Sequence, residues 1–383
     1  MTKVGFIRQQ VPAPAAPEGA LIVPNPAEIS RPVPSRPPTW VWMLIFVGGA
    51  VILMVLLYTS GAKSSFTGGL FVFPMMLVSM MMMMRNRGGG EKKNRPSVLN
   101  AERADYHRQL DDLRDDVHAA AAAQAREISY HHPDPREGAL LSLVGTPRMW
   151  ERTPDKTNWG HVRLGVGVTR LNKKLTPPVK VPPPEYRETT TAVAARDFLL
   201  AQNVVHDIAR PLHLFDQIGW SFFDDSGEHR AVVQGTLRAL VCQLCLFHGP
   251  DVVQVAVITD DADAWEWAKW LPHTADPEFI DASGPARLLF DDVEGFLARF
   301  GEQLRHRERW APYMEGTSRP EGSLVVVVDF PGADCAPILD GTGFKGVSVL
   351  EATGDQDSVL ANADSAFVVD EVGNLLKAAQ EVS

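Results

Sequence analysis

Two long runs without a charged residue stand out near the start of the chain, at residues 40–58 and 66–84. Each run has nineteen residues. At about 1.5 Å per residue, such a helix spans most of a ~30 Å hydrocarbon core. Trp40, Trp42 and Tyr58 lie at the ends of the first run, where amphipathic rings favour the headgroup region. The pattern predicts a hairpin of two transmembrane helices over residues 39–84, and the alternative for each run is a buried core helix.

The basic residues around the two runs predict the orientation of this hairpin. Five positive residues follow the second run and four precede the first, whereas only Lys63 lies between them. Because basic residues are retained on the cytoplasmic side, we expect a multi-pass membrane protein with both termini in the cytoplasm. Neither run contains Asp, Glu, His or Arg, which argues against an ion path through the hairpin alone.

A proline-rich segment precedes the hairpin and a helical pattern follows it. Proline lacks the amide donor and restricts its neighbour, so residues 1–38 are predicted to form an extended, uncovered cytosolic tail. Beyond a flexible joint at Gly88–Gly90, a helix is predicted over residues 97–130 from an apolar stripe at steps of four, three and four. The stripe consists of Tyr106, Leu110, Leu113 and Val117. Such a stripe usually pairs with another helix or lies along a partner, and the alternative is a solvated spacer. We predict a joint and stalk over residues 85–135.

From about residue 140 the chain alternates apolar strands with amphipathic helices. The runs 252–258 and 324–328 are almost entirely apolar, as strands are when a parallel sheet is covered on both faces. Further strands are predicted at 162–168, 220–223, 347–350 and 366–369, and helices at 191–202, 229–247, 262–270 and 292–307. This alternation indicates an α/β fold with a mainly parallel, doubly wound sheet in a cytosolic domain over residues 136–383.

One residue of this domain is a candidate for nucleotide chemistry. Asp329 directly follows an apolar strand, as the Mg²⁺-binding carboxylate of a Walker B strand does. The matching phosphate loop would lie in the turn before the 229–247 helix. That turn contains one glycine and three carboxylates, which would repel phosphate. Its residues are Asp224, Asp225, Ser226, Gly227 and Glu228. No G-x-x-x-x-G-K-[ST] motif occurs in the chain, so ATP hydrolysis by this chain alone is not expected.

Three other clusters of reactive side chains have structural interpretations. A cysteine–histidine cluster on one predicted helix lacks a fourth zinc ligand, which favours two buried cysteines and a surface histidine. A tryptophan cluster is interpreted as a packed corner, and a histidine–aspartate cluster as the elbow between stalk and domain. The clusters are Cys242, Cys245 and His248; Trp265, Trp267 and Trp270; and His131, His132 and Asp134. No catalytic or metal site is assigned.

Net charge divides the chain into a basic head and an acidic body. The first 96 residues hold ten basic and three acidic residues, so they carry +7 and the remainder carries -17, for a total of -10. A basic head suits a membrane surface, whereas an acidic body argues against nucleic acid as a partner. Three cysteines in 383 residues exclude a disulfide scaffold.

Short motifs follow one another in a fixed order over nearly the whole chain. They are the methionine-rich second run, Asn100–Tyr106, Tyr130–Pro135, Val144–Arg152, Arg238–Leu244, Phe247–Asp251, Trp267–His273 and Val325–Asp329. In this order they resemble the N-terminal part of EccC, the FtsK/SpoIIIE-type motor protein of mycobacterial type VII (ESX) secretion systems. The Walker A position of an ATPase is lost here, so only the Walker-B-like Asp329 carries over.

The resemblance implies the anchoring and coupling region of an inner-membrane secretion motor, with a RecA-like sheet set on the stalk. It implies EccB-, EccD- and EccE-type partner subunits, with ubiquitin-like domains of EccD along the stalk, and a higher-order oligomer. Substrates would be WXG-type heterodimers, bound through downstream modules that use ATP and Mg²⁺. Whole EccC chains continue into FtsK-like ATPase modules, whereas this sequence stops at Ser383. The alternatives are a non-motor membrane scaffold and the anchor of an FtsK-like DNA translocase, which the acidic body disfavours.

Overall fold

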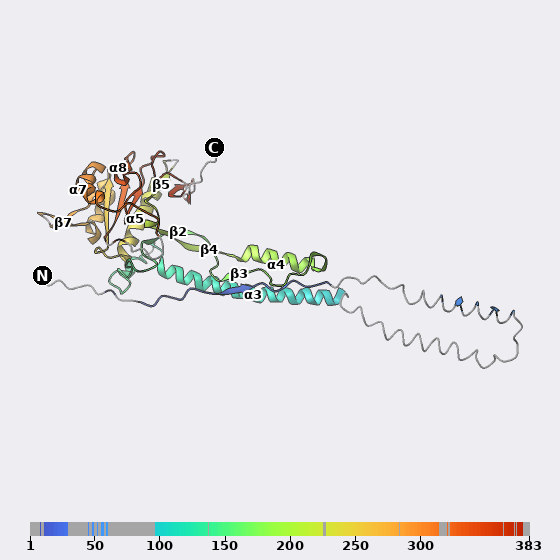
Figure 1. Ribbon diagram of the computed structural model, residues 1–383. Helices are drawn as coiled ribbons and strands as arrows, with labels where there is room; N and C mark the ends of the chain where they lie inside the picture. The colour runs from blue at the N-terminus through green and yellow to red at the C-terminus, as the bar shows by residue number, and fades with distance from the viewer. Residues whose placement is uncertain are drawn as a thin grey trace. The chain divides into compact units, whose positions relative to one another are not determined.

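The chain folds into two compact units, a helical unit and a sheet unit (Figure 1). The computed structural model describes residues 8, 11–29, 96–136, 138–224, 227–282, 284–313, 320, 322–362, 364–370, 372 and 374–377, with seven single positions between 45 and 59. The helical unit comprises Glu18–Ala121 and Leu171–Val204, and the sheet unit comprises Met1–Pro17, Ala122–Arg170 and Val205–Ser383. The predicted hairpin over residues 39–84 lies outside the described residues, apart from those seven positions.

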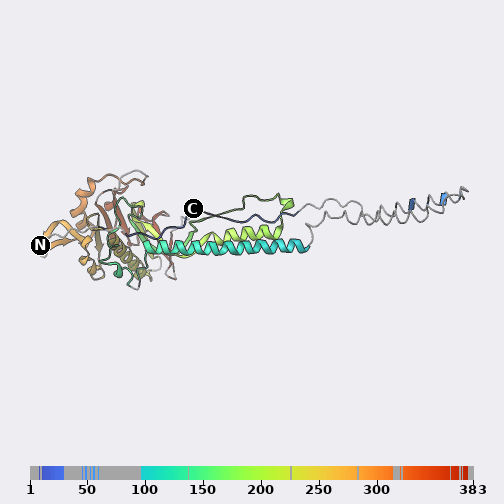
Figure 2. The same ribbon diagram turned by 90° about the horizontal axis from the view of Figure 1, so that it is seen from below.

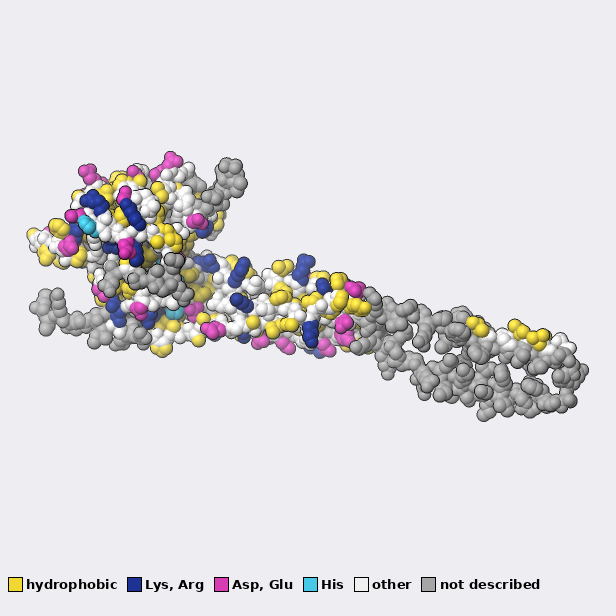
Figure 3. Space-filling view, in the orientation of Figure 1, with side chains coloured by type: hydrophobic (Ala, Val, Ile, Leu, Met, Phe, Trp, Pro, Cys, Tyr) yellow, Lys and Arg dark blue, Asp and Glu magenta, His cyan; other side chains and the backbone are white. Residues whose placement is uncertain are grey.

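The helical unit is built on two helices, α3 (Pro96–His131) and α4 (Thr189–Gln202), which lie side by side (Figures 1 and 2). The 36 residues of α3 include the whole helix predicted over 97–130. Its apolar stripe is buried within the unit, and the phenol of Tyr106 donates a hydrogen bond to the carbonyl of Pro24 at 3.1 Å. Charged side chains cover the opposite, exposed face of α3 (Figure 3).

The apolar stripe of α3, for which the sequence left a helix partner, another subunit or solvent as alternatives, is buried. The five buried side chains are Tyr106, Leu110, Leu113, Val117 and Ala120. Burying a large apolar side chain stabilises the fold by about 1.5–3 kcal/mol, so burial of the stripe within the same chain is favourable. The stripe therefore packs within its own chain, which agrees with pairing to another helix and not with a solvated spacer.

The N-terminal segment also packs in the helical unit. β1 (Ala20–Ile22) pairs in parallel with β3 (Lys174–Thr176), and Leu21 and Val23 are buried. The prediction of an uncovered tail is wrong for this segment, because Ala20–Val23 is a proline-free apolar stretch whose amides are free to pair. Residues 171–204 were expected inside the domain over 136–383. They belong to the helical unit, where β3 pairs with β1 and α4 lies beside α3 (Figure 1).

The sheet unit contains a seven-stranded sheet with the order β13-β12-β5-β11-β10-β6-β9. Every pairing in it is parallel except β12–β13, which is antiparallel. The strands are β5 (Gly219–Asp224), β6 (Val253–Thr259), β9 (Leu289–Phe290), β10 (Ser323–Asp329), β11 (Val347–Glu351), β12 (Ala366–Val369) and β13 (Leu375–Lys377). The predicted mainly parallel α/β sheet is confirmed.

Helices cover both faces of this sheet. Val255 and Val257 of β6 face a core cluster that includes Leu244 of α5, whereas Ala256 and Ile258 face a second cluster formed with α7 and α8. The helices are α5 (Arg230–Phe247), α6 (Ala262–Trp265), α7 (Val293–Arg305) and α8 (Ala336–Leu339). Alternating side chains of one strand thus enter two cores, which is why its sequence is apolar without interruption.

Within the described part of the chain, α5 is the one helix that is long and apolar enough to cross a membrane. Half of it is buried inside the protein, and it packs against β5 and the long strand β2 (His161–Arg170). Its apolar composition therefore reflects the core of the sheet unit.

Four strands of the sheet unit form two separate two-stranded sheets, β2 with β4 (Val204–His213) and β7 (Ala275–Asp281) with β8 (Gly284–Arg287). Only β2 was predicted. β4 contains Pro211 and many polar residues, and the short β7–β8 hairpin has no clear alternation, so neither has the periodicity of a half-buried strand.

Candidate functional site

The candidate site lies at the carboxyl ends of the parallel strands, where open α/β sheets bind their ligands. Asp329 is the last residue of β10 and Asp224 the last residue of β5, with β11 between these two strands. Asp329 is 0% exposed, so its carboxylate must find all its partners within the protein.

Three donors surround the Asp329 carboxylate. Arg230 donates from Nη2 to Oδ1 at 3.1 Å, and Oδ2 accepts from Gln234 Nε2 at 2.9 Å and from Trp265 Nε1 at 2.8 Å. The guanidinium of Arg230 also lies 4.0 Å from Asp260, and its side chain is 40% exposed. Arg230 therefore places a positive charge beside the buried Asp329 carboxylate. A cation approaching Asp329 would meet a guanidinium and two further donors where it needs free oxygen ligands.

The local sequence explains why these three side chains meet. Arg230 and Gln234 are four residues apart at the start of α5, so both extend from one face of the helix. Trp265 ends α6, the short helix that follows β6 beside β10. In a parallel sheet the helices begin at the carboxyl edge of the strands, so the starts of α5 and α6 lie near Asp329.

Two backbone amides of the turn after β5 point at Asp224. The amide of His229 donates to Asp224 Oδ2 at 2.6 Å, and the amide of Gly227 donates to the carbonyl of Asp224 at 3.3 Å. In a phosphate-binding loop such amides point at the ligand. Here Asp224 accepts both. Asp225 and Ser226 lie outside the described residues, and Glu228 is exposed.

A second carboxyl group, that of Glu351, lies at the carboxyl edge of the sheet and was not predicted from the sequence. Glu351 ends β11 and is completely buried, with Ser358 Oγ donating to its Oε2 at 2.9 Å. Burial raises the pKa of Glu351 and favours its neutral form. The only signal in the sequence was a glutamate directly after the apolar run 347–350, the same signal that identified Asp329.

Two details of the reactive clusters are corrected by the structure. Trp265 is buried as a packed corner requires, but Trp270 is 79% exposed. His248, expected at the surface, is fully buried: its Nε2 accepts from the amide of Gly160 at 3.0 Å, and its Nδ1 lies 3.0 Å from the carbonyl of Leu244. The last residues of α5 are buried inside the sheet unit, and His248, which directly follows the helix, is buried with them. No group of three His, Cys, Asp or Glu side chains among the described residues could hold a metal ion.

The end of α3 is held by arginines of the sheet unit. Arg152 is fully buried and donates to the carbonyls of His131 and His161. Asp134 accepts from Arg163 at 3.2 Å, just beyond the end of the helix. These contacts fix the last residues of α3 within the sheet unit through charge-assisted hydrogen bonds.

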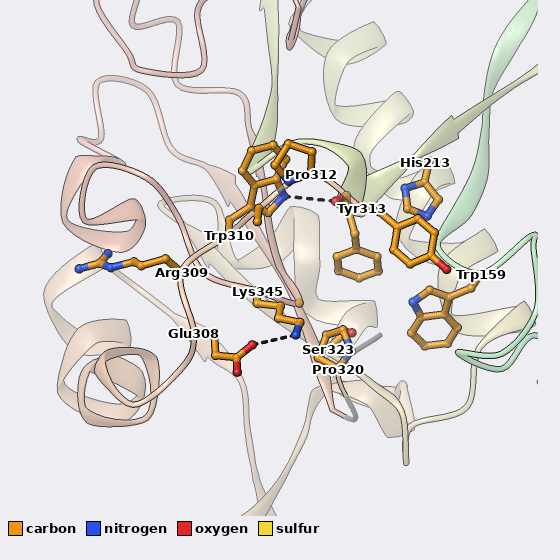
Figure 4. Close-up of a pocket in the computed structure, with 13 residues that line it drawn as sticks. Trp159, His213, Glu308, Arg309, Trp310, Pro312, Tyr313, Pro320, Ser323 and Lys345 are labelled. Atoms are coloured by element: carbon orange, nitrogen blue, oxygen red, sulfur yellow. Dashed lines mark hydrogen bonds and ion pairs between the residues drawn. The ribbon is translucent and has the colours of Figure 1, made fainter. Parts of the chain in front are cut away.

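A separate pocket of about 180 Å³ lies at the amino end of β10, where Ser323 begins the strand (Figure 4). Aromatic rings of Trp159, Trp310 and Tyr313 line it, and an ion pair joins Lys345 to Glu308 at 2.7 Å. Asp329 lies at the other end of the same strand, about 20 Å away at 3.3 Å per residue. The pocket is therefore distinct from the site around Asp329.

Comparison with solved structures gives two EccC chains of Thermomonospora curvata. One is described as ATPases 2 and 3 in complex with a signal sequence peptide, with a TM-score of 0.31, 14% identity and coverage of 56% of this chain and 37% of that one. The other is the cytoplasmic domain of the type VII secretion ATPase EccC, with a TM-score of 0.31, 14% identity and coverage of 62% and 25%. No family model matches the chain.

Sequence comparison gives closer relatives. The ESX-5 secretion system protein EccC5 of Mycobacterium tuberculosis H37Rv is 34% identical over 364 residues, 92% of this chain and 25% of that protein. The ESX secretion system protein EccC of Thermomonospora curvata is 32% identical over 348 residues, 89% of this chain and 25% of that protein. The chain thus spans about a quarter of the length of these relatives. Over nearly its whole length, the chain is homologous to the EccC proteins of ESX secretion systems.

Proposed function

We propose that this chain is the membrane-anchoring and coupling region of the motor subunit of a type VII (ESX) secretion complex. We propose further that its sheet unit is an ATPase-like domain that does not hydrolyse ATP. The similarity to EccC proteins supports the role in secretion. The observation that carries the second part is the set of three donors that occupy the Asp329 carboxylate.

The strand order supports a RecA-like assignment. Leaving aside the two-residue β9 at the edge, the parallel strands along the chain are β5, β6, β10, β11 and β12. Across the sheet their order is fifth, first, fourth, third, second, as in RecA-like ATPases. In that order the phosphate loop follows the first strand and the Walker B carboxylate ends the third. We assign the turn that follows β5 and the carboxylate of Asp329 to these two positions.

Both elements of a nucleotide site are changed at these positions. The loop has no lysine, and its Asp224 accepts the amides of Gly227 and His229. The Walker B carboxylate is paired with Arg230. Removing one partner of a pair with a buried charge costs up to several kcal/mol, so binding of Mg²⁺ at Asp329 would have to overcome that loss. The sheet unit then serves as a folded connector, and ATP and Mg²⁺ act at motor modules elsewhere in the complex.

The anchoring and coupling roles rest on the sequence and on α3. The two predicted spans would hold the chain in the inner membrane with both termini in the cytoplasm. α3 contributes residues to both units, and its 36 residues extend about 54 Å as a continuous helix. EccB-, EccD- and EccE-type subunits would surround it in a higher-order oligomer, and WXG-type substrates would bind elsewhere on the motor. A non-motor scaffold and a DNA translocase are the competing functions, and the acidic body disfavours the second.

Inserting Gly-Gly-Ser-Gly between Ala121 and Ala122, where α3 passes from one unit to the other, tests the coupling role. The insertion interrupts the continuous helix with a flexible segment, so we expect substrate secretion to fall by roughly tenfold in cells carrying the full-length motor subunit. Membrane localisation and ATP turnover of that subunit should stay unchanged. The measurement is the amount of substrate in the culture medium, relative to the cell-associated amount.

The matched control is the same insertion between Gln356 and Asp357, two exposed residues of a surface turn. We expect it to leave secretion unchanged. Undiminished secretion with the α3 insertion would mean that a continuous helix is not needed, which would contradict coupling through α3. Loss of ATP turnover with the α3 insertion would point to a damaged motor instead.

A further inference from the structure

The loop between β3 and α4 carries an exposed apolar tip. Val179 is 75% exposed and Val181 is 46% exposed, with the exposed Lys180 between them. Prolines surround this tip at residues 177, 178 and 182–184, which restricts the loop to extended conformations. Single exposed valines are common at protein surfaces. Two valines held outward on either side of a lysine, on a stiff loop, form a small amphipathic wedge.

Hydrogen bonds hold this loop against the last described residues before the first predicted span. The amide of Lys180 donates to Asn25 Oδ1 at 2.9 Å, and the amide of Ile29 donates to the carbonyl of Tyr186 at 2.7 Å. Only ten residues separate Ile29 from Trp40, where the first span is predicted to begin.

The loop also lies at the end of the helical unit where α3 begins (Figures 1 and 2). Glu188, at the start of α4, accepts from Arg103 Nη2 at 2.8 Å. Arg103 is seven residues, or about two turns, from Pro96, the first residue of α3. Eleven residues separate Pro96 from Met84, the end of the second predicted span. Both connections to the hairpin therefore start from the end of the unit that carries the wedge.

The two connecting segments are strongly basic. Residues 30–39 and 85–95 hold seven basic residues and one acidic residue, Glu91, for a net charge of +6. Basic residues next to a transmembrane helix are attracted to anionic headgroups. This attraction would draw the start of α3 and the neighbouring loop to the bilayer surface.

We propose that Pro177–Pro184 is a membrane-contact loop, in which Val179 and Val181 enter the headgroup region and Lys180 binds lipid phosphate. The proposal rests on the proposed function in one respect, that the hairpin spans a bilayer. A lysine with a long apolar stem can keep its ammonium at the phosphates while the neighbouring valines lie deeper. The loop itself has a net charge of +1 between residues 177 and 187, from Lys180, Glu185 and Arg187, so it does not repel an anionic surface. It would orient the helical unit on the membrane at a second point besides the hairpin.

Fluorescence quenching on the full 383-residue chain tests this contact. The chain is reconstituted into vesicles of phosphatidylcholine and phosphatidylglycerol, with the partly exposed Cys242 replaced by serine. A nitrobenzoxadiazole dye is attached to Val179→Cys, to Ile52→Cys in the first predicted span, or to Leu200→Cys. Leu200 is a matched control, because it is 69% exposed and belongs to α4 of the same unit.

A deep doxyl group on the lipid should quench the dye at residue 52, and a shallow one the dye at residue 179, each about twofold more than at residue 200, which iodide in the water should quench instead. If residue 52 is quenched by lipid but residue 179 is as exposed to iodide as residue 200, the loop proposal is overturned and the anchor stands. Protection of residue 179 from both quenchers would assign the loop to a protein partner and also overturn it. Absence of lipid quenching at residue 52 would overturn the anchor on which the proposal rests.

Discussion

Replacing Asp329 by alanine is expected to lower the free energy of unfolding of the sheet unit by about 3 kcal/mol. The change leaves the buried indole N–H of Trp265 and the amide of Gln234 without their acceptor. Arg230 is 40% exposed and can turn to water, which keeps the loss at the lower end of the range for broken buried pairs. Asp329→Asn keeps the shape of the acceptor and should cost about 1–2 kcal/mol. Denaturant unfolding of the full chain, followed by tryptophan fluorescence, measures both changes.

Asp260→Ala is the matched control for these variants. Asp260 also faces Arg230, but at 4.0 Å, and its side chain is 46% exposed. Its loss should change stability by less than about 0.5 kcal/mol. An Asp329→Ala variant as stable as the unmodified chain would show that the donors around Asp329 are not structural, and the role assigned to Arg230 would be withdrawn.

Mild acid is expected to destabilise the sheet unit steeply. His132, His248 and His273 are buried, and burial is the main cause that lowers the pKa of each: to about 2 for His132, to about 4 for His273, and well below 6.5 for His248. Above pH 6.5 these histidines are neutral in both the folded and the unfolded chain. Below it the unfolded chain binds protons that the folded chain excludes, so the free energy of unfolding falls as the pH falls.

The size of this effect follows from proton linkage. Each excluded proton costs about 1.4 kcal/mol per pH unit, so His132 and His273 together approach about 3 kcal/mol per unit between pH 6.5 and about 4, and His248 adds to the slope in the same direction. Urea unfolding at about pH 7 and about pH 5 measures the slope. His132→Phe removes one proton site and should lower the slope by about a third. Equal stability at both pH values would contradict the buried, neutral state of these histidines.

The sequence predicts the main strands well because each carries its own local signal. The apolar runs at 252–258 and 324–328 correspond to β6 and β10, which both cores enclose. Asp329 was identified in the same way, from its place after such a run. The short strands β1 and β3 were not predicted, because a three-residue strand has no periodicity and its partner lies about 150 residues away in the sequence.

The candidate site could be predicted only in part. Its carboxylate ends a recognisable strand, but Arg230, Gln234 and Trp265 come from two helices that precede it in the chain by 99, 95 and 64 residues. Periodicity assigns each of these residues to an element and carries no information on which side chains converge at the sheet edge. The burial of His248 was missed for the same reason, since the sequence does not reveal what covers a helix end. The membrane hairpin stays a prediction.

Calorimetric titration of Mg·ATP into the full 383-residue chain in lipid nanodiscs tests the central claim most directly, that the nucleotide position of the sheet unit is occupied by the protein's own side chains. We expect no saturable heat up to roughly millimolar nucleotide, because Asp329 is paired with Arg230 and the turn directly after β5 contains no lysine. Saturable binding with a Kd in the micromolar range, lost in Asp329→Asn, would contradict the account and make this domain a working nucleotide site.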